Sequence, residues 1–455
     1  MFTALRQHVL IPFHEGVIRR RHVARYRRFA DNSQWWPREQ LLAYQRDARQ
    51  QLLRHAYEQT PYWREVLDAR RLPPAGISDD AFRTLPTTTK AAIREQRFRM
   101  RAADHAGRIW TKATGGSTGE PLPIDYTAES YDWRVAMSRR GYSWSGYEEG
   151  MRQVSIWGAF SIGRESRLST AKAELHRRMA GRVLVNSLRM DDAARRDCVD
   201  TINRHAPASI VGFTNPLYEL ARFIGEHGGL RVRPRSVIAA AEKPHGYQRE
   251  AIEAAFGCPA FETYGNREFM LIAAECERHD GLHLSAENLY VEILDDAGHP
   301  VRPGELGEIV ITDLHNYGMP FIRYRTGDMA VATDRRCACG RGLPLIEQIV
   351  GRRLDLIRTP DGSAVAGEFF PFLLKAVPGI RQFQVVQPAL DRLTIRMVAD
   401  ADLEAPVTAA VRHEIARICG EQMQVTFERL DAIPLTPEGK LRMSISCVGQ
   451  EAVPA

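Results

Sequence analysis

The sequence has no run of 18 consecutive apolar residues, the length that a membrane-spanning helix needs. Its start, Met1 to Leu10, also lacks the apolar core and small-residue cleavage site of a secretory signal. It shows no internal repeat, and its 34 glycines and 25 prolines in 455 residues exclude a collagen-like or low-complexity polymer. We therefore expect a cytoplasmic globular protein of two or three domains with no transmembrane segment.

Cysteine is scarce and odd in number, with seven residues, which argues against a disulfide framework. Four cysteines are isolated and are expected to be small buried hydrophobic residues: Cys198, Cys258, Cys419 and Cys447. The other three, Cys276, Cys337 and Cys339, fall in two short segments that are considered below.

The net charge of +6 is mild and permits an anionic ligand such as a nucleotide or coenzyme A. The excess is steepest over residues 1–28, where seven arginines and the single acid Glu15 are interleaved with apolar residues such as Val17 and Ile18. Contact with a membrane surface or nucleic acid would explain this composition. We favour an amphipathic helix docked on the body with its charges in solvent, because no helix-turn-helix or aromatic-rich pattern follows. Nucleic acid is not expected as a partner.

The periodicity of the sequence indicates an α/β fold. Apolar residues recur at helical spacing over residues 35–105, and from Ile109 short β-rich runs alternate with helical ones. This alternation predicts a large domain with parallel-rich sheets flanked by helices. The expected strands are 152–157, 182–185, 209–211, 237–240 and 260–263, then 289–294 and 307–312 around a hairpin turn at 295–298.

A smaller α+β module of about 100 residues is expected after Gly351. It has predicted strands at 383–386 and 393–398, a helix at 405–419 and a loop-rich tail. The predicted organisation is a helical region at 1–105, a core at 106–350, a connection at 351–355 and a C-terminal domain at 356–455.

A loop rich in glycine and hydroxyl residues follows an extended run at 108–112. Its backbone N–H groups and hydroxyls can surround phosphate oxygens. It is not a Walker A loop, because no Gly-Lys-Ser/Thr closes it. It does match the Gly-x-Ser-x-Gly nucleophile elbow of hydrolases, but Pro121 and Pro123 oppose the helix that must follow such an elbow. The loop consists of Thr114, Gly115, Gly116, Ser117, Thr118 and Gly119.

Four further motifs follow in order: Phe261–Glu268, Tyr324–Asp328, Gly351–Asp355 and Pro434–Leu441. Together with the loop, this series resembles the adenylate-forming superfamily of acyl-CoA synthetases, luciferases and peptide-synthetase adenylation domains. The strongest likeness is to its phenylacetate–CoA ligase and CapK-type branch. It covers about Gln50 to Arg442, and the stretches that carry it include Thr60–Trp63, Gly281–His283, Asn316–Tyr324 and Cys337–Arg341.

The resemblance implies a role for each matched residue. The loop would hold the β- and γ-phosphates of ATP, Tyr264 and Gly265 would border the adenine, and Glu268 would bind Mg²⁺. Asp328 would accept hydrogen bonds from the ribose, with Arg352 close to the ribose and phosphate. Asp355 matches the hinge about which the C-terminal domain rotates, and Lys440 would stabilise charge as the carboxylate attacks the α-phosphorus. Arg267 stands where the superfamily usually has threonine, and Leu354 stands where an acid is common.

The adenine and acyl pockets are expected near strand ends. Glu242 matches the position at which the superfamily's backbone runs past the adenine. A solvated Glu242–Lys243 pair at the end of the strand explains the residue equally well. The acyl pocket would draw on residues that core packing could also account for: Trp133, Trp157, Gly158, Ala159, Phe160, Phe213 and Thr214.

The likeness to a cysteine–histidine site in the branch also implies a structural Zn²⁺. Three thiolates and one imidazole would form a closed tetrahedral shell. The ligands would be Cys276, Cys337, Cys339 and a histidine, with His283 preferred over His279 because a predicted strand fixes its direction. Reduced cysteines that pack as small hydrophobic residues are the alternative.

Taken together, the motifs predict an ATP- and Mg²⁺-dependent ligase. It would convert an aromatic or heteroaromatic carboxylic acid to an acyl-adenylate and then, after domain rotation, to a coenzyme A thioester. The alternatives are transfer to an amine, hydroxyl or carrier protein, a noncatalytic nucleotide-binding protein, and a Ser117 hydrolase. The resemblance allows a homodimer and a carrier protein as partners.

Overall fold

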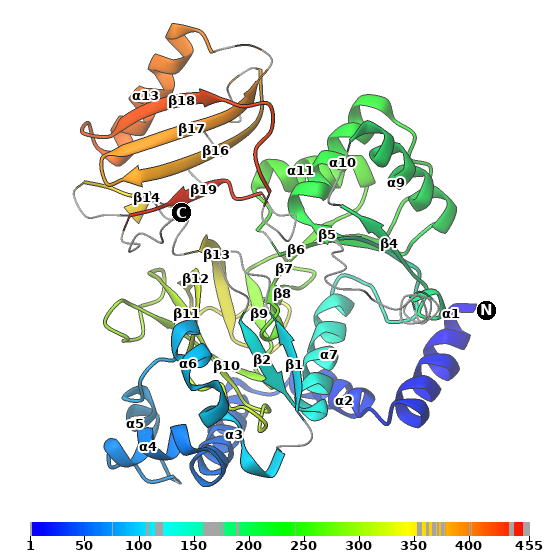
Figure 1. The fold of residues 1–455 in the computed structure, drawn as a ribbon. Coiled ribbons are helices and arrows are strands. Elements are labelled where there is room, and N and C mark those ends of the chain that lie inside the picture. Colours follow the sequence, from blue (N-terminus) through cyan, green and yellow to red (C-terminus); the bar gives the residue numbers. More distant parts are fainter. Residues whose placement is uncertain are drawn as a thin grey trace. The chain divides into compact units, whose positions relative to one another are not determined.

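The computed structural model divides the chain into two compact units (Figure 1), one formed by 1–326 and 330–349 and the other by 327–329 and 350–455. The structure describes residues 2–74, 76–105, 109–113, 122–157, 174, 177–187, 191–241, 243–352, 357–360, 364–365, 370, 373–374, 377, 379–399, 401, 403–435 and 441–448. The predicted fold class, a large α/β part with a small α+β C-terminal part, is confirmed.

The first hundred residues are helical, as predicted. Proline and hydroxyl residues set the starts of these helices: Pro61 occupies the first turn of α4, and the Thr60 hydroxyl accepts a hydrogen bond from the Trp63 amide. The elements are α1 (Phe2–Leu5), η1 (Arg6–Leu10), η2 (Phe13–Ile18), α2 (Val23–Ser33), α3 (Arg38–Gln59), α4 (Pro61–Ala69), α5 (Asp79–Arg83), α6 (Lys90–Met100) and η3 (Ala103–His105).

An 11-stranded sheet forms the core of the first unit, in the order β10-β11-β12-β13-β9-β8-β7-β6-β5-β3-β4. The half from β7 to β4 is parallel, and α9, α10 and α11 cover one of its faces while α7 lies on the other (Figure 1). Its elements are α7 (Ala128–Ser143), β3 (Gln153–Trp157), β4 (Arg182–Asn186), α9 (Asp192–His205), β5 (Ser209–Phe213), α10 (Thr214–His227), β6 (Ser236–Ala240), α11 (Gly246–Phe256) and β7 (Ala260–Asn266).

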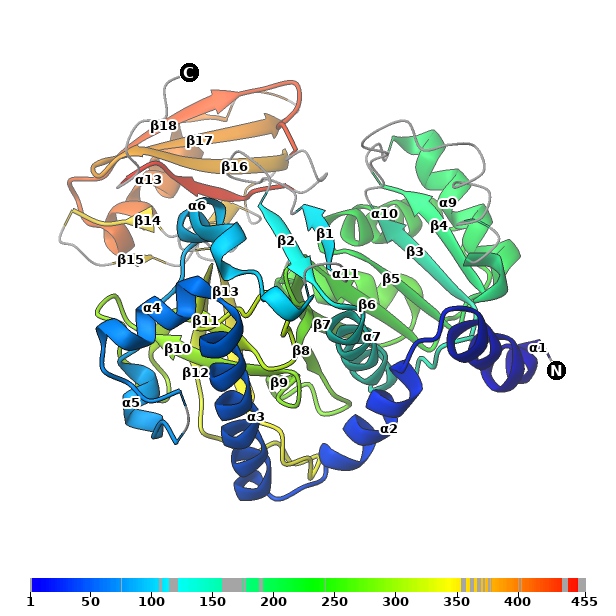
Figure 2. The same cartoon turned by 60° about the horizontal axis from the view of Figure 1, so that its bottom comes forward.

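The other half of the sheet holds antiparallel pairs, and α3 packs against it (Figure 2). Its strands are β8 (Met270–Glu275), β9 (Leu282–Leu284), β10 (Leu289–Leu294), β11 (Leu306–Asp313), β12 (Tyr324–Ala332) and β13 (Leu345–Arg352). The predicted turn forms, with the Gly298 amide 3.1 Å from the Asp295 carbonyl oxygen. It does not join β10 directly to β11, because the chain first turns back so that Pro300 bridges Leu294.

The second unit is a four-stranded sheet in the order β18-β17-β16-β19 with α13 packed on it. Helix α13 has the predicted bounds, whereas the expected loop-rich tail contains two strands, β18 and β19. The elements are β14 (Ile357–Arg358), β15 (Ala364–Val365), β16 (Ile380–Ala389), β17 (Arg392–Ala399), α13 (Ala405–Cys419), β18 (Gln424–Arg429) and β19 (Ser444–Ser446).

Two expectations from composition can be compared with this fold. No helix among the described residues is long and apolar enough to cross a membrane. Cys198, Cys258 and Cys419 are buried as expected, but Cys447 is exposed, because it follows the short strand β19 near the end of the described chain.

Candidate active site

The glycine-rich loop is carried by a two-stranded hairpin of β1 (Trp110–Ala113) and β2 (Pro123–Tyr126). The two strands are antiparallel, and Ala113 is paired with Pro123, so residues 114–122 connect them. The loop itself, Thr114 to Gly119, lies outside the described residues. A nucleophile elbow needs a strand followed by a helix, and here a strand follows instead, so the structure argues against a Ser117 hydrolase.

Lys112, which the sequence analysis did not select, is positively charged and lies immediately before the loop. Lys112 as a whole is exposed, but its ammonium group is surrounded by protein atoms. This burial, together with the charges of Arg134, Arg21 and Arg267, lowers the pKa of Lys112. The ammonium nitrogen lies 4.4 Å from the centre of the Tyr131 ring. Neighbouring cations repel one another, and a bound anion offsets this repulsion. The position of Lys112 at the end of the extended run did not by itself distinguish it from other surface lysines.

The hairpin is held to α6 through Asp125, whose side chain is completely buried. The carboxylate accepts hydrogen bonds from Arg97 Nε at 2.8 Å, Arg101 Nε at 2.7 Å and Thr111 Oγ1 at 2.6 Å. Burial alone would raise the pKa of Asp125, but these hydrogen bonds outweigh burial and lower it to about 2.

Two aromatic residues predicted for the acyl pocket meet at the carboxyl ends of neighbouring parallel strands. Trp157 ends β3 and Phe213 ends β5, and their ring centres are 4.4 Å apart. Thr214 follows as the first residue of α10 and is buried. Ligands of open α/β sheets bind at this edge.

Trp133 packs elsewhere. It stacks on Tyr26 at 4.4 Å and on His315 at 4.1 Å between ring centres, so it belongs to the core between α2 and α7. Gly158, Ala159, Phe160 and Glu242 lie outside the described residues.

Glu268, the predicted Mg²⁺ ligand, lies in the turn between β7 and β8. Its residue is only 6% exposed, and its carboxylate accepts a hydrogen bond from the Tyr324 hydroxyl at 3.1 Å. Tyr264 is buried in β7. Gly265 has a structural reason to be glycine, because a Cβ there would lie 2.1 Å from the Met270 carbonyl oxygen.

Asp328 and Arg352, the predicted ribose pair, lie together in the second unit. Arg352 Nε is 3.8 Å from Asp328 Oδ1, and both side chains are partly buried. The remaining predicted residues of this site, Asp355 and Lys440, fall outside the described residues.

Four predicted zinc ligands converge in the first unit. Their donor atoms, from Cys276, His283, Cys337 and Cys339, all lie within 4.8 Å of one another. Cys276 Sγ is 3.7 Å from Cys337 Sγ, and Cys339 Sγ is 3.3 Å from His283 Nε2. Tetrahedral zinc with Zn–S bonds of about 2.3 Å separates its sulfur ligands by about 3.8 Å, so the four groups fit the ion.

The surroundings of this cluster act in two directions, because burial raises the pKa of Cys276 to about 12 while backbone amides approach two of the sulfurs. The backbone amides of Arg278 and Arg341 each lie 3.5 Å from a cysteine sulfur, and burial lowers the pKa of His283 to about 4, which keeps the imidazole neutral. His279 is not part of the cluster, because its Nδ1 lies 3.0 Å from Glu275 Oε2.

The chain has relatives of known class. Residues 357–446 match the family model of the CapK C-terminal domain. A phenylacetate–coenzyme A ligase of Thermus thermophilus is 24% identical, over 89% of this chain and 94% of that protein. The CapK protein of Staphylococcus aureus is 21% identical, over 85% and 84%. A crystal structure of 2-hydroxyisobutyryl-CoA ligase has the same fold, with a TM-score of 0.69 and 19% identity over 91% of both chains.

The fold and the relatives together support an adenylate-forming enzyme of the AMP-forming acid–thiol ligase type. The chain is similar to proteins of the phenylacetate–CoA ligase and CapK branch of that superfamily.

Proposed function

We propose that this chain converts an aromatic or heteroaromatic carboxylic acid to its coenzyme A thioester through an acyl-adenylate. In the first step a carboxylate oxygen attacks the α-phosphorus of ATP and pyrophosphate leaves. In the second step the thiol of coenzyme A attacks the acyl carbon, loses its proton and displaces AMP. Division of the reaction into these two steps is favourable, because a carboxylate is a poor electrophile and AMP is a good leaving group.

The observation that carries the proposal is the position of Glu268. It is a buried carboxylate directly after a strand of the parallel half, held by Tyr324. Such a group can bind Mg²⁺, which accepts one or two carboxylates and completes its shell with phosphate oxygens and water. When bound, the ion would neutralise charge on the triphosphate.

The cations near the hairpin support the placement of the triphosphate. Lys112 and the loop at 114–119 would face the β- and γ-phosphates, and Arg267 and Arg134 add positive charge. Asp328 would accept both ribose hydroxyls beside Arg352, and Lys440 would approach the α-phosphate.

The preference for an aromatic acid rests on Trp157 and Phe213. Their tilted ring pair places two aromatic side chains at the sheet edge where α/β ligands bind. Relatives named as phenylacetate–coenzyme A ligases agree with an acid of this kind.

We also propose a structural Zn²⁺ at Cys276, His283, Cys337 and Cys339. Four protein ligands leave no open position, so the ion would not activate water. It would instead fasten the 337–341 segment to β8 and β9.

The test is pyrophosphate release across a panel of carboxylic acids, with and without coenzyme A. We expect release to depend on an aromatic acid and a thioester to form only when coenzyme A is present. Lys440→Ala is the matched inactive control, and it should slow adenylate formation far more than thioester formation from supplied adenylate. Release that is independent of any acid would contradict the proposal, and an adenylate that transfers only to an amine or carrier protein would contradict the acceptor.

A further inference from the structure

The N-terminal segment forms one continuous helical rod over residues 2–18, on the outside of the first unit (Figures 1 and 2). Six of the fourteen large apolar side chains that are exposed in the described part of the chain lie on this rod, with exposed fractions between 44% and 73%. Five recur every three or four residues and so share one face of the rod. The six are Phe2, Leu5, Val9, Phe13, Val17 and Ile18.

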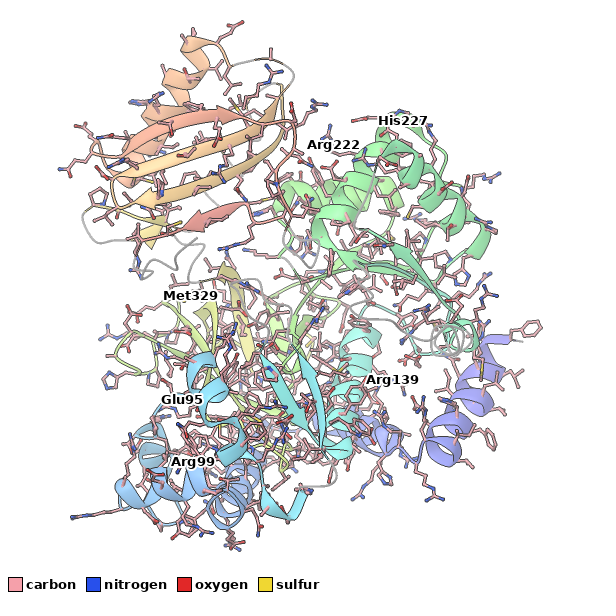
Figure 3. All side chains as sticks on the ribbon, in the orientation of Figure 1. Glu95, Arg99, Arg139, Arg222, His227 and Met329 are labelled. Atoms are coloured by element: carbon pink, nitrogen blue, oxygen red, sulfur yellow. The ribbon has the colours of Figure 1, made fainter. Side chains whose placement is uncertain are left out.

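The opposite face of the rod holds it to the body. A Cβ at Gly150 would lie 2.8 Å from Gln7 Cγ and 3.2 Å from Ile11 Cδ1, so the rod packs closely there. Glu15 forms an ion pair with Arg139 of α7 (labelled in Figure 3), with 2.9 Å between Oε2 and a guanidinium nitrogen. A docked helix normally buries its apolar side, and this one presents it to solvent. The docking predicted from the sequence occurs, but with the helix facing the other way.

The charge around the exposed face is positive. Arg19, Arg20, Arg25 and Arg28 are exposed at and beyond the end of the rod. Glu15, the single acid in residues 1–28, is compensated by Arg139. An apolar strip flanked by arginines matches a surface that is apolar inside and negatively charged outside. A second copy of this chain carries the same positive charge and so offers no complementary charge to these arginines.

We propose that residues 2–18 bind the surface of a membrane that contains anionic lipids. The rod would lie along the boundary between headgroups and acyl chains, with Phe2, Val9 and Phe13 in the acyl region and the arginines at the phosphates. This surface is independent of the ligase chemistry and does not rest on it.

Co-sedimentation with vesicles tests the proposal on the full chain. We expect binding to vesicles of phosphatidylcholine with phosphatidylglycerol, weakened by high salt, and much weaker binding to phosphatidylcholine alone. Phe13→Glu should weaken binding at least about tenfold, because it removes an aromatic side chain that would enter the acyl region and adds a negative charge. Arg19→Gln should weaken it about fivefold.

The matched control is Phe98→Glu, at a phenylalanine on α6 that is even more exposed than Phe13, which should leave binding unchanged. Thermal melting identical to that of the wild type shows that each variant is folded. No binding to anionic vesicles, equal binding to both kinds of vesicle, or equal losses for Phe13→Glu and Phe98→Glu would overturn the proposal. A wild-type dimer that Phe13→Glu dissociates, without vesicle binding, would assign the face to self-association instead.

Discussion

Single residues near the glycine-rich loop show how charge is distributed in this enzyme. Lys112 is surrounded by other cations and its pKa is lowered, so its charge is stabilised when an anion arrives. Asp125 is the opposite case, a carboxylate enclosed by three donors that leave it strongly acidic. Lys112 is therefore suited to bind an anionic ligand, whereas Asp125 holds the hairpin against α6.

Lys112→Gln is expected to raise the KM for ATP about tenfold, because one charge–phosphate contact contributes on the order of 1.4 kcal/mol. The KM for the carboxylic acid should stay within about twofold, because the lost contact is made to ATP and not to the acid. Steady-state kinetics with each substrate varied separately measures both. Lys90→Gln, at the start of α6, is the control for loss of a lysine charge, and an equal rise in both KM values for Lys112→Gln would contradict this role.

Asp125→Asn should lower stability at pH 7 by about 1 to 3 kcal/mol, since it removes the charge partner of two partly exposed arginines, Arg97 and Arg101, and weakens their hydrogen bonds to a buried group. The native pKa of Asp125 lies below that of an unfolded aspartate, so its contribution is present above about pH 4 and is lost as the pH falls towards 2. Urea unfolding of both proteins at pH 7 and pH 3 should therefore show a smaller difference at pH 3. Asp80→Asn, at an exposed ion pair, should change little at either pH. A difference that grows on acidification would contradict the assignment.

At the scale of elements, the proposed zinc ligands bring together three segments that are distant in sequence. Cys276 follows β8, His283 lies in β9, and Cys337 and Cys339 precede β13. Binding free energy at such a site is also folding free energy.

We expect purified protein to contain one equivalent of zinc, measured by elemental analysis of a preparation never exposed to chelator. Cys337→Ser should lose most of the metal and several degrees of melting temperature, because one of four ligands is removed. Cys198→Ser, at a buried cysteine outside the cluster, should keep its zinc. Wild-type protein with no more zinc than a buffer blank would refute the site.

The elements that could be predicted are those with local signals. Helix α13 has a proline in its first turn and Gly420 after its end, and its predicted bounds match. Strand β8 was missed because both of its faces are buried, so the run Met270–Glu275 has no alternation. Strand β9 is only three residues long. The exposure of the apolar face of the N-terminal rod could not be predicted, because amphipathicity does not say which face of a helix the rest of the protein covers.

Candidate site residues were predictable where a motif carried them. Tertiary structure then decided which of them meet: Trp157 and Phe213 do, whereas Trp133 belongs to another cluster. Lys112 was missed because no pattern of residue types distinguishes it from other surface lysines. Its neighbours Arg21, Arg134 and Arg267 are spread over 247 positions of the sequence.

At the scale of the whole molecule, the chain consists of two compact units, each with its own core. Two units joined by a short connection are suited to a two-step reaction in which the C-terminal unit rotates between steps. The hinge at 351–355 stays a prediction, since residues 353–356 lie outside the described part.

Asp355→Pro should leave pyrophosphate release within about twofold of wild type and slow thioester formation at least about tenfold, because proline fixes φ and opposes rotation. The two half-reactions are measured separately, by pyrophosphate release and by thioester formation from supplied adenylate. Asp355→Ala removes the same carboxylate but keeps φ free and should support both. Normal thioester formation by the proline variant would place the pivot elsewhere.

The pairing of β19 with β16 also limits how far Lys440 can lie from the second unit. Ser444 is fixed beside Val385 in the sheet of that unit, and Lys440 precedes it by four residues. A chain of four residues spans at most about 14 Å. The short strand β19 therefore acts as an anchor, and any rotation of the second unit would carry Lys440 with it.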